Sequence, residues 1–141
     1  MTEKELNIVR ELSKKIRDLE RHLQALRLSV QNITPVLDGL PHSTEVKFRV
    51  EKLALSVIEK ERELEELKEQ FLHEQGRLAE FILSNVIEPT TQTLLILRYV
   101  ACLSFKEIAR RMHFTLRHVF RLHEKFLKDV ICLHIVAQNE S

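Results

Sequence analysis

Several residue types that carry common functions are scarce or missing in this chain. Tryptophan is absent, tyrosine occurs once and glycine only twice in 141 residues. With so little glycine there is no glycine-rich phosphate loop, and neither a nucleophile elbow nor a paired-carboxylate site can be picked out. These absences argue against an enzyme, and we expect no cofactor.

Cysteines and long apolar runs are also limited. Cys102 and Cys132 lie in apolar stretches and form no C-x-x-C pair, so we interpret them as buried thiols in a reducing compartment, with a disulfide as the alternative. No stretch approaches the roughly 18 consecutive apolar residues of a membrane span. The N-terminus carries early acidic residues instead of the apolar run of a signal peptide. The sequence predicts a soluble, cytoplasmic protein with no membrane contact.

Seven histidines raise the question of a metal site. His113, His118 and His123 are spaced five apart, which places neighbours about 140° from each other around a helix. Metal ligands on one helix need a spacing of three or four residues, so no metal site is expected. We interpret His123 as a partly buried, hydrogen-bonded side chain.

Charge is unevenly distributed along the chain. The net charge is only +1, and residues 1–87 hold 14 Lys and Arg against 16 Asp and Glu. Residues 104–128 hold seven basic and two acidic side chains. The small total therefore hides a local basic patch, which is typical of a segment that contacts nucleic acid.

The first 87 residues contain two ladders of apolar residues with a period of 3.5, which is typical of coiled coils. The ladders are interrupted at Lys60 and Glu74, and a segment rich in Pro and Gly, 34–44, predicts the turn between them. We expect a bend or a weakened turn at Gly76. The members of the ladders are Leu12, Ile16, Leu19, Leu23, Leu26, Val30 and Ile33, then Val46, Val50, Leu53, Val57, Leu64, Leu67, Phe71, Leu78 and Phe81.

The coiled-coil period ends before residue 88. Pro89 suits the first turn of a new, mostly buried helix that contains Leu94, Leu95, Leu97 and Val100. The predicted fold is therefore all-α. A long antiparallel coiled-coil hairpin over residues 1–87, with its turn near 34–44, is followed by a compact helix-turn-helix domain over 88–141.

Residues 104–128 predict two short helices joined by a tight turn. Ser104 is an N-cap that Glu107 completes as a capping box, His113 and Phe114 form the turn, and Thr115 is the next N-cap. The first helix has one apolar face, formed by Ile108, Ala109 and Met112.

The second helix separates apolar from basic side chains. Val119, Leu122 and Phe126 share one face, while Arg117 and Arg121 lie nearly opposite, together with Glu124. This pattern predicts a helix-turn-helix whose recognition helix, about 115–128, enters the major groove of double-stranded DNA. Helical spacing predicts core packing for Phe114 and Phe126 and leaves the role of Phe120 open.

We assign the basic side chains to two kinds of contact, because guanidinium groups on the recognition helix can pair with guanine edges and the others are better placed for phosphates. The predicted base contacts are Arg117, His118, Arg121 and Lys125. The predicted phosphate contacts are Lys106, Arg110, Arg111, Thr115 and Lys128.

Residues 88–130 resemble region 4 of bacterial sigma-70-type factors. Behind a charged coiled-coil arm, residues 117–130 look more like small phage-encoded late-transcription regulators of the RinA/ArpU kind. The resemblance implies a domain that reads promoter DNA and touches RNA polymerase. It departs at His113, where such motifs often carry glycine. The matching residues are Leu97, Arg98, Tyr99, Leu103, Ser104, Glu107, Ile108, Ala109, Val119 and Leu122.

The expected function is sequence-specific DNA binding in transcription regulation, with a phage or prophage origin. One alternative is an RNA polymerase-binding mimic of region 4, and another is a terminase-like DNA-packaging protein. A complete sigma factor is disfavoured because the chain has no aromatic-rich segment to open a duplex. A homodimer or higher oligomer is expected, through the arm or through residues 130–137, which alternatively continue the last helix and pack within the chain.

Overall fold

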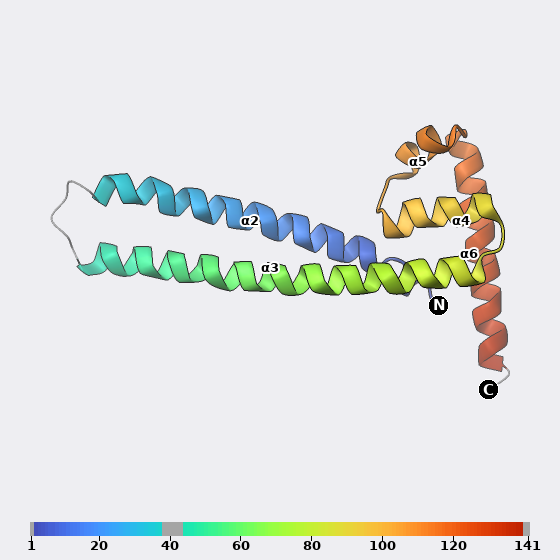
Figure 1. The fold of residues 1–141 in the computed structure, drawn as a ribbon, viewed down its shortest axis with the longest axis horizontal. Coiled ribbons are helices and arrows are strands. Elements are labelled where there is room, and N and C mark those ends of the chain that lie inside the picture. The colour runs from blue at the N-terminus through green and yellow to red at the C-terminus, as the bar shows by residue number, and fades with distance from the viewer. Residues whose placement is uncertain (1, 38–43, 140–141) are drawn as a thin grey trace. The chain divides into compact units, whose positions relative to one another are not determined.

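The computed structural model describes the backbone of residues 2–37 and 44–139, and the side chains of residues 2–32, 45 and 47–129. Every regular element in these ranges is helical, which confirms the all-α prediction. Figure 1 shows the elements in chain order. They are α1 (Glu3–Leu6), α2 (Ile8–Leu37), α3 (Thr44–Asn85), α4 (Pro89–Leu95), a π-helical segment η1 (Ile96–Val100), α5 (Phe105–Met112) and α6 (Leu116–Asn139).

The helices form two compact units. One comprises Lys14–Gln70, which we call the arm, and the other comprises Met1–Ser13 with Phe71–Ser141, which we call the compact unit. The compact unit therefore includes residues 1–13 and 71–87, which the sequence analysis assigned to the hairpin. The C-terminal part of α3 thus contributes to the same core as α4, α5 and α6.

In the arm, α2 and α3 run antiparallel. Arg27 Nη2 lies 2.7 Å from Glu61 Oε1, and Lys68 Nζ lies 3.6 Å from Glu20 Oε1, so later residues of α2 pair with earlier residues of α3. Exposed ion pairs of this kind contribute at most about 1 kcal/mol each. Most of the stability comes from the apolar seam, in which three α2 residues of the predicted ladder are buried, namely Ile16, Leu19 and Leu23.

Two local expectations about the arm and α3 are wrong. Helix α2 continues to Leu37, so residues 34–37, which include Pro35, are helical and not part of the connection. Pro35 has no N–H to donate, so α2 lacks one backbone hydrogen bond there, two residues before the helix ends. The rest of the predicted turn, 38–43, lies outside the described residues. Helix α3 runs through Gly76 without interruption to Asn85, because one glycine costs a 42-residue helix only about 1 kcal/mol.

The compact unit has a continuous apolar core. Leu6 and Val9 at the start of the chain are buried in it, and Thr2 and Glu5 form a capping box at the start of α1. Pro89 occupies the first turn of α4, as predicted. The remaining buried members are Leu78, Ile82, Leu94, Leu95, Tyr99, Ile108, Ala109, Val119 and Phe126.

The π-helical segment η1 continues α4 directly and ends before the non-helical residues 101–104 that lead to α5. Its wider turn is closed by hydrogen bonds from Ala101 N–H to the Ile96 carbonyl and from Leu103 N–H to the Leu97 carbonyl. Gln75 on α3 donates from Nε2 to the Val100 carbonyl at 2.9 Å. This side-chain bond satisfies a backbone acceptor that the end of the helix leaves open.

Candidate nucleic-acid interface

Helices α5 and α6 are joined by a turn of three residues, 113–115. Ser104 caps α5 by accepting the Glu107 N–H at 3.2 Å, and Thr115 Oγ1 accepts the His118 N–H at 3.2 Å at the start of α6. Both predicted N-caps are therefore confirmed. The Glu107 carboxylate does not complete the predicted box but pairs with Arg110 and with Arg111.

The turn itself requires a left-handed residue. His113 has φ 58° and ψ 37° and forms the C-cap of α5, with its N–H directed at the Ala109 and Arg110 carbonyls. A residue with a Cβ adopts this conformation at a cost, and glycine is the usual choice. Glycine at position 113 would therefore avoid the cost that His113 incurs in this conformation.

The inner face of α6 is anchored in the core. Val119 is fully buried and Phe126 is 7% exposed, while Leu122 is half-buried, as the helical spacing predicted. Ile108 and Ala109 of α5 are buried in the same core. The direction in which the outer face of α6 points is therefore determined by packing.

The outer face carries the predicted base-contacting cations. Arg117, Arg121 and Lys125 are exposed, and His118 is half-buried because its ring packs edge-on against Phe114 at 4.8 Å. Among the described side chains, no carboxylate lies within ion-pair distance of Arg117, Arg121 or Lys125. Their charges are thus available to an anionic partner.

The predicted phosphate contacts are exposed on both helices. Lys106, Arg110 and Arg111 lie on α5, Lys128 lies on α6, and Thr115 precedes it. Arg110 Nη2 and Arg111 Nε share one carboxylate oxygen of Glu107, at 3.0 and 3.5 Å. An exposed pair of this kind is weak enough to exchange for a phosphate. The Thr115 hydroxyl accepts the capping hydrogen bond and still has a proton to donate.

Arg98 packs on the aromatic side chains next to the candidate interface, a role that the sequence analysis did not predict. The Arg98 guanidinium lies 3.8 Å from the centre of the Phe105 ring and donates from Nη1 to the Leu103 carbonyl at 3.1 Å. Burial lowers the pKa of Arg98. A single half-buried arginine in an apolar helix gives no periodic signal, so only its tertiary neighbours reveal this role.

Tyr99 and His123 link η1 to α6. The Tyr99 hydroxyl and His123 Nε2 form a hydrogen bond, which confirms the interpretation of His123 as partly buried and satisfied. Burial raises the pKa of Tyr99 to about 12. Burial, and then the charge of Arg98, lower the pKa of His123. Both rings are therefore neutral near pH 7, which suits a buried hydrogen bond.

Two large apolar side chains on α6 are exposed. Leu116 is 38% exposed and Phe120 is 42% exposed, although the spacing had left Phe120 open and gave Leu116 no role. The Phe120 ring lies edge-on to Phe105, 5.0 Å between centres. Helical spacing placed Phe120 away from the core direction, but the exposure of Leu116 depends on which neighbours cover that side of the helix and gave no signal in the sequence.

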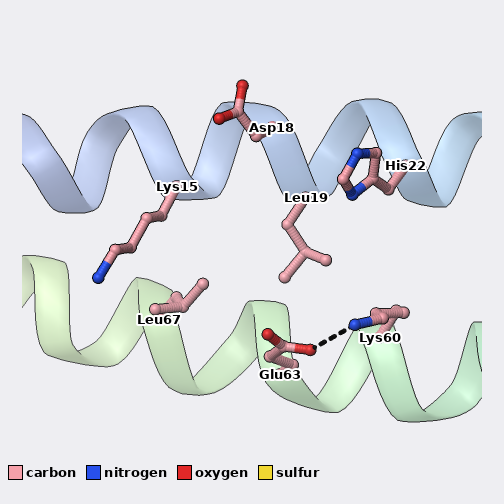
Figure 2. A pocket seen from close by; sticks show the side chains of 7 residues that line it. All are labelled: Lys15, Asp18, Leu19, His22, Lys60, Glu63 and Leu67. Atoms are coloured by element: carbon pink, nitrogen blue, oxygen red, sulfur yellow. Dashed lines mark hydrogen bonds and ion pairs between the residues drawn. The ribbon is translucent and has the colours of Figure 1, made fainter.

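The arm contains a hollow of about 490 Å³ between α2 and α3, beside the ladder interruption at Lys60. Figure 2 shows Leu19 pointing toward α3, Asp18 pointing away from it, and the Lys60 ammonium paired with Glu63. Lys60, a charged side chain at a seam position, is one of the residues that line it. The hollow does not select a ligand by charge, since two lysines and two carboxylates line it.

Within the described ranges, no group of three His, Cys, Asp or Glu side chains is placed to hold a metal ion. None of the helices in the same ranges combines the length and the apolar character needed to cross a membrane. The side chains of residues 130–137 lie outside the described ones, although their backbone continues α6.

Comparison of the chain with protein-family models, with curated proteins and with solved structures gives no match.

Proposed function

We propose that this protein is a sequence-specific DNA-binding transcription regulator. In this proposal α5 and α6 act as a helix-turn-helix, and the first turns of α6 enter the major groove. The observation that carries the proposal is the division of α6 into a buried face, anchored by Val119 and Phe126, and an exposed face that carries Arg117 and Arg121. A rigid helix that presents unpaired guanidinium groups is suited to reading base edges.

The proposed contacts differ in what they contribute. Arg117 and Arg121 lie one turn apart, and each can donate two hydrogen bonds to O6 and N7 of a guanine, with His118 and Lys125 at the flank. The cations of α5, with Thr115 and Lys128, would bind phosphates. Phosphate contacts provide affinity and salt dependence, whereas base contacts provide sequence preference.

The arm would set the oligomeric state. Its antiparallel helices, with ion pairs Arg27–Glu61 and Glu20–Lys68, have the character of a coiled-coil hairpin. A homodimer would present two recognition helices to two half-sites, which is how many helix-turn-helix proteins gain specificity. The resemblance to sigma region 4 and to phage late regulators adds RNA polymerase as a proposed second partner.

Fluorescence anisotropy with duplex DNA tests the proposal. Binding should weaken steeply with salt, with a log–log slope of several units. Arg121→Ala should weaken binding to a selected site by about 1–3 kcal/mol. The matched control is Arg62→Ala, which removes an exposed arginine from the arm and should leave the dissociation constant unchanged.

The outcomes separate the candidate functions. Failure to bind any duplex at low salt, together with retention of RNA polymerase on the immobilised chain, would replace the proposal with the adaptor function. Equal losses for Arg121→Ala and Arg62→Ala would show that α6 is not the reading element. Ring-shaped oligomers without a preferred sequence would indicate DNA packaging instead.

A further inference from the structure

Two large apolar side chains are exposed beside the proposed base-contacting arginines. Leu116 is 38% exposed and Phe120 is 42% exposed, in the first two turns of α6. At 100° per residue they lie about 40° apart around the helix, and Arg117 follows about 60° beyond Phe120. Apolar and cationic groups thus share one continuous surface of the helix, in its first two turns.

The apolar part of this surface is held in place. The Phe120 ring lies edge-on to Phe105, and Phe105 is itself covered by the Arg98 guanidinium at 3.8 Å. The neighbouring Val119 is fully buried, so the helix cannot rotate to hide Phe120. The side chain is therefore preorganised, and little conformational entropy is lost when it makes a contact.

The surrounding charge identifies the occupant of this surface. Residues 115–128 hold four Lys and Arg side chains and one acidic side chain, Glu124. A polyanion that also offers apolar groups matches this combination. In the major groove that group is the C5-methyl of thymine, which apolar side chains contact. Two side chains cover far less than the roughly 1,000 Å² that a stable protein interface needs.

We infer that Leu116 and Phe120 form an apolar reading edge that recognises thymine methyl groups. The binding site would then carry thymines next to the guanines that Arg117 and Arg121 prefer. This inference rests on the proposed DNA-binding function and adds a base class to it. It also gives a role to Phe120, which points away from the core direction and is therefore not accounted for by core packing.

Deoxyuridine tests the inference because it differs from thymidine only in lacking the methyl group, so all hydrogen-bonding groups remain. A site is first selected from random duplexes with the full-length chain. Anisotropy then compares that duplex with versions in which single thymines are replaced by deoxyuridine. Each contacted methyl should change the dissociation constant by about fourfold, the equivalent of one buried methyl-sized group.

Variants show which side chains are responsible. Leu116→Ala and Phe120→Ala should each reduce the preference for thymine over uracil. Leu72→Ala, which removes a 65% exposed leucine from α3, should keep it. Because Phe120 contacts Phe105, circular dichroism must show that its variant is folded, and Leu116→Ala tests the same inference without that contact.

The two proposals fail in different ways. If the chain binds no duplex, DNA binding itself is overturned and the reading edge with it. If the chain binds DNA with equal affinity for thymine and uracil at every position, only the reading edge is overturned. Retention of the full thymine preference in both alanine variants would also overturn it.

Discussion

Replacing His113 with glycine should stabilise the compact unit. His113 has φ 58° and ψ 37°, and it is exposed. A left-handed conformation costs a residue with a Cβ about 1–2 kcal/mol, although histidine tolerates it better than most residues do. Glycine removes that cost, but its greater conformational freedom stabilises the unfolded chain by about 0.4–1 kcal/mol. The net gain should be about 0.5–1 kcal/mol in the free energy of unfolding.

The chain provides its own probe for this measurement. It has no tryptophan, and its single tyrosine, Tyr99, is buried in the compact unit. Tyrosine fluorescence during urea denaturation therefore reports the unfolding of this unit and not of the arm. Lys125→Gly is the matched control, because Lys125 is exposed within α6 and glycine there should cost about 1 kcal/mol.

The two glycine variants should thus move the midpoint in opposite directions. If His113→Gly destabilises the unit as much as Lys125→Gly does, the turn does not require a left-handed residue at this position. The connection between α5 and α6 would then have another geometry. The face of α6 that points away from the core would then differ as well.

Three further variants test other parts of the structure. Gly76→Ala should raise stability by about 0.5–1 kcal/mol, because the added Cβ meets open space within a continuous helix, and a loss in thermal circular dichroism would contradict this. Ile108→Ala should cost about 2–5 kcal/mol in urea denaturation, since Ile108 is fully buried, and a loss below 1 kcal/mol would show a loose core. The compact unit should lose stability as the pH falls below about 6.5, because burial lowers the pKa of His123 and the unfolded chain then binds a proton that the folded chain excludes. His123→Gln should flatten this pH dependence between pH 5 and 7, and an unchanged slope would assign it to other groups.

The helical elements could be predicted because their signals are local. The 3.5-residue ladder, the N-caps Ser104 and Thr115, and the apolar spacing of Val119, Leu122 and Phe126 each depend on residues within one or two helical turns. The two N-caps and the inward face of Val119, Leu122 and Phe126 agree with the structure, and Ile16, Leu19 and Leu23 of the ladder are buried. The same local rules misplaced the end of α2 and predicted a bend at Gly76, whereas α2 runs past Pro35 to Leu37 and α3 runs through Gly76 to Asn85.

The sequence by itself determined that the chain is helical, that α6 has one apolar and one basic face, and which cations the basic face carries. Only the tertiary structure decided that residues 1–13 join the core of α4 to α6, that η1 is a π-helix, and that Arg98 covers Phe105. It also decided that Leu116 and Phe120 remain exposed. The physical reason is that helical periodicity is a property of neighbouring residues, whereas burial depends on segments that are distant in the chain and meet only on folding.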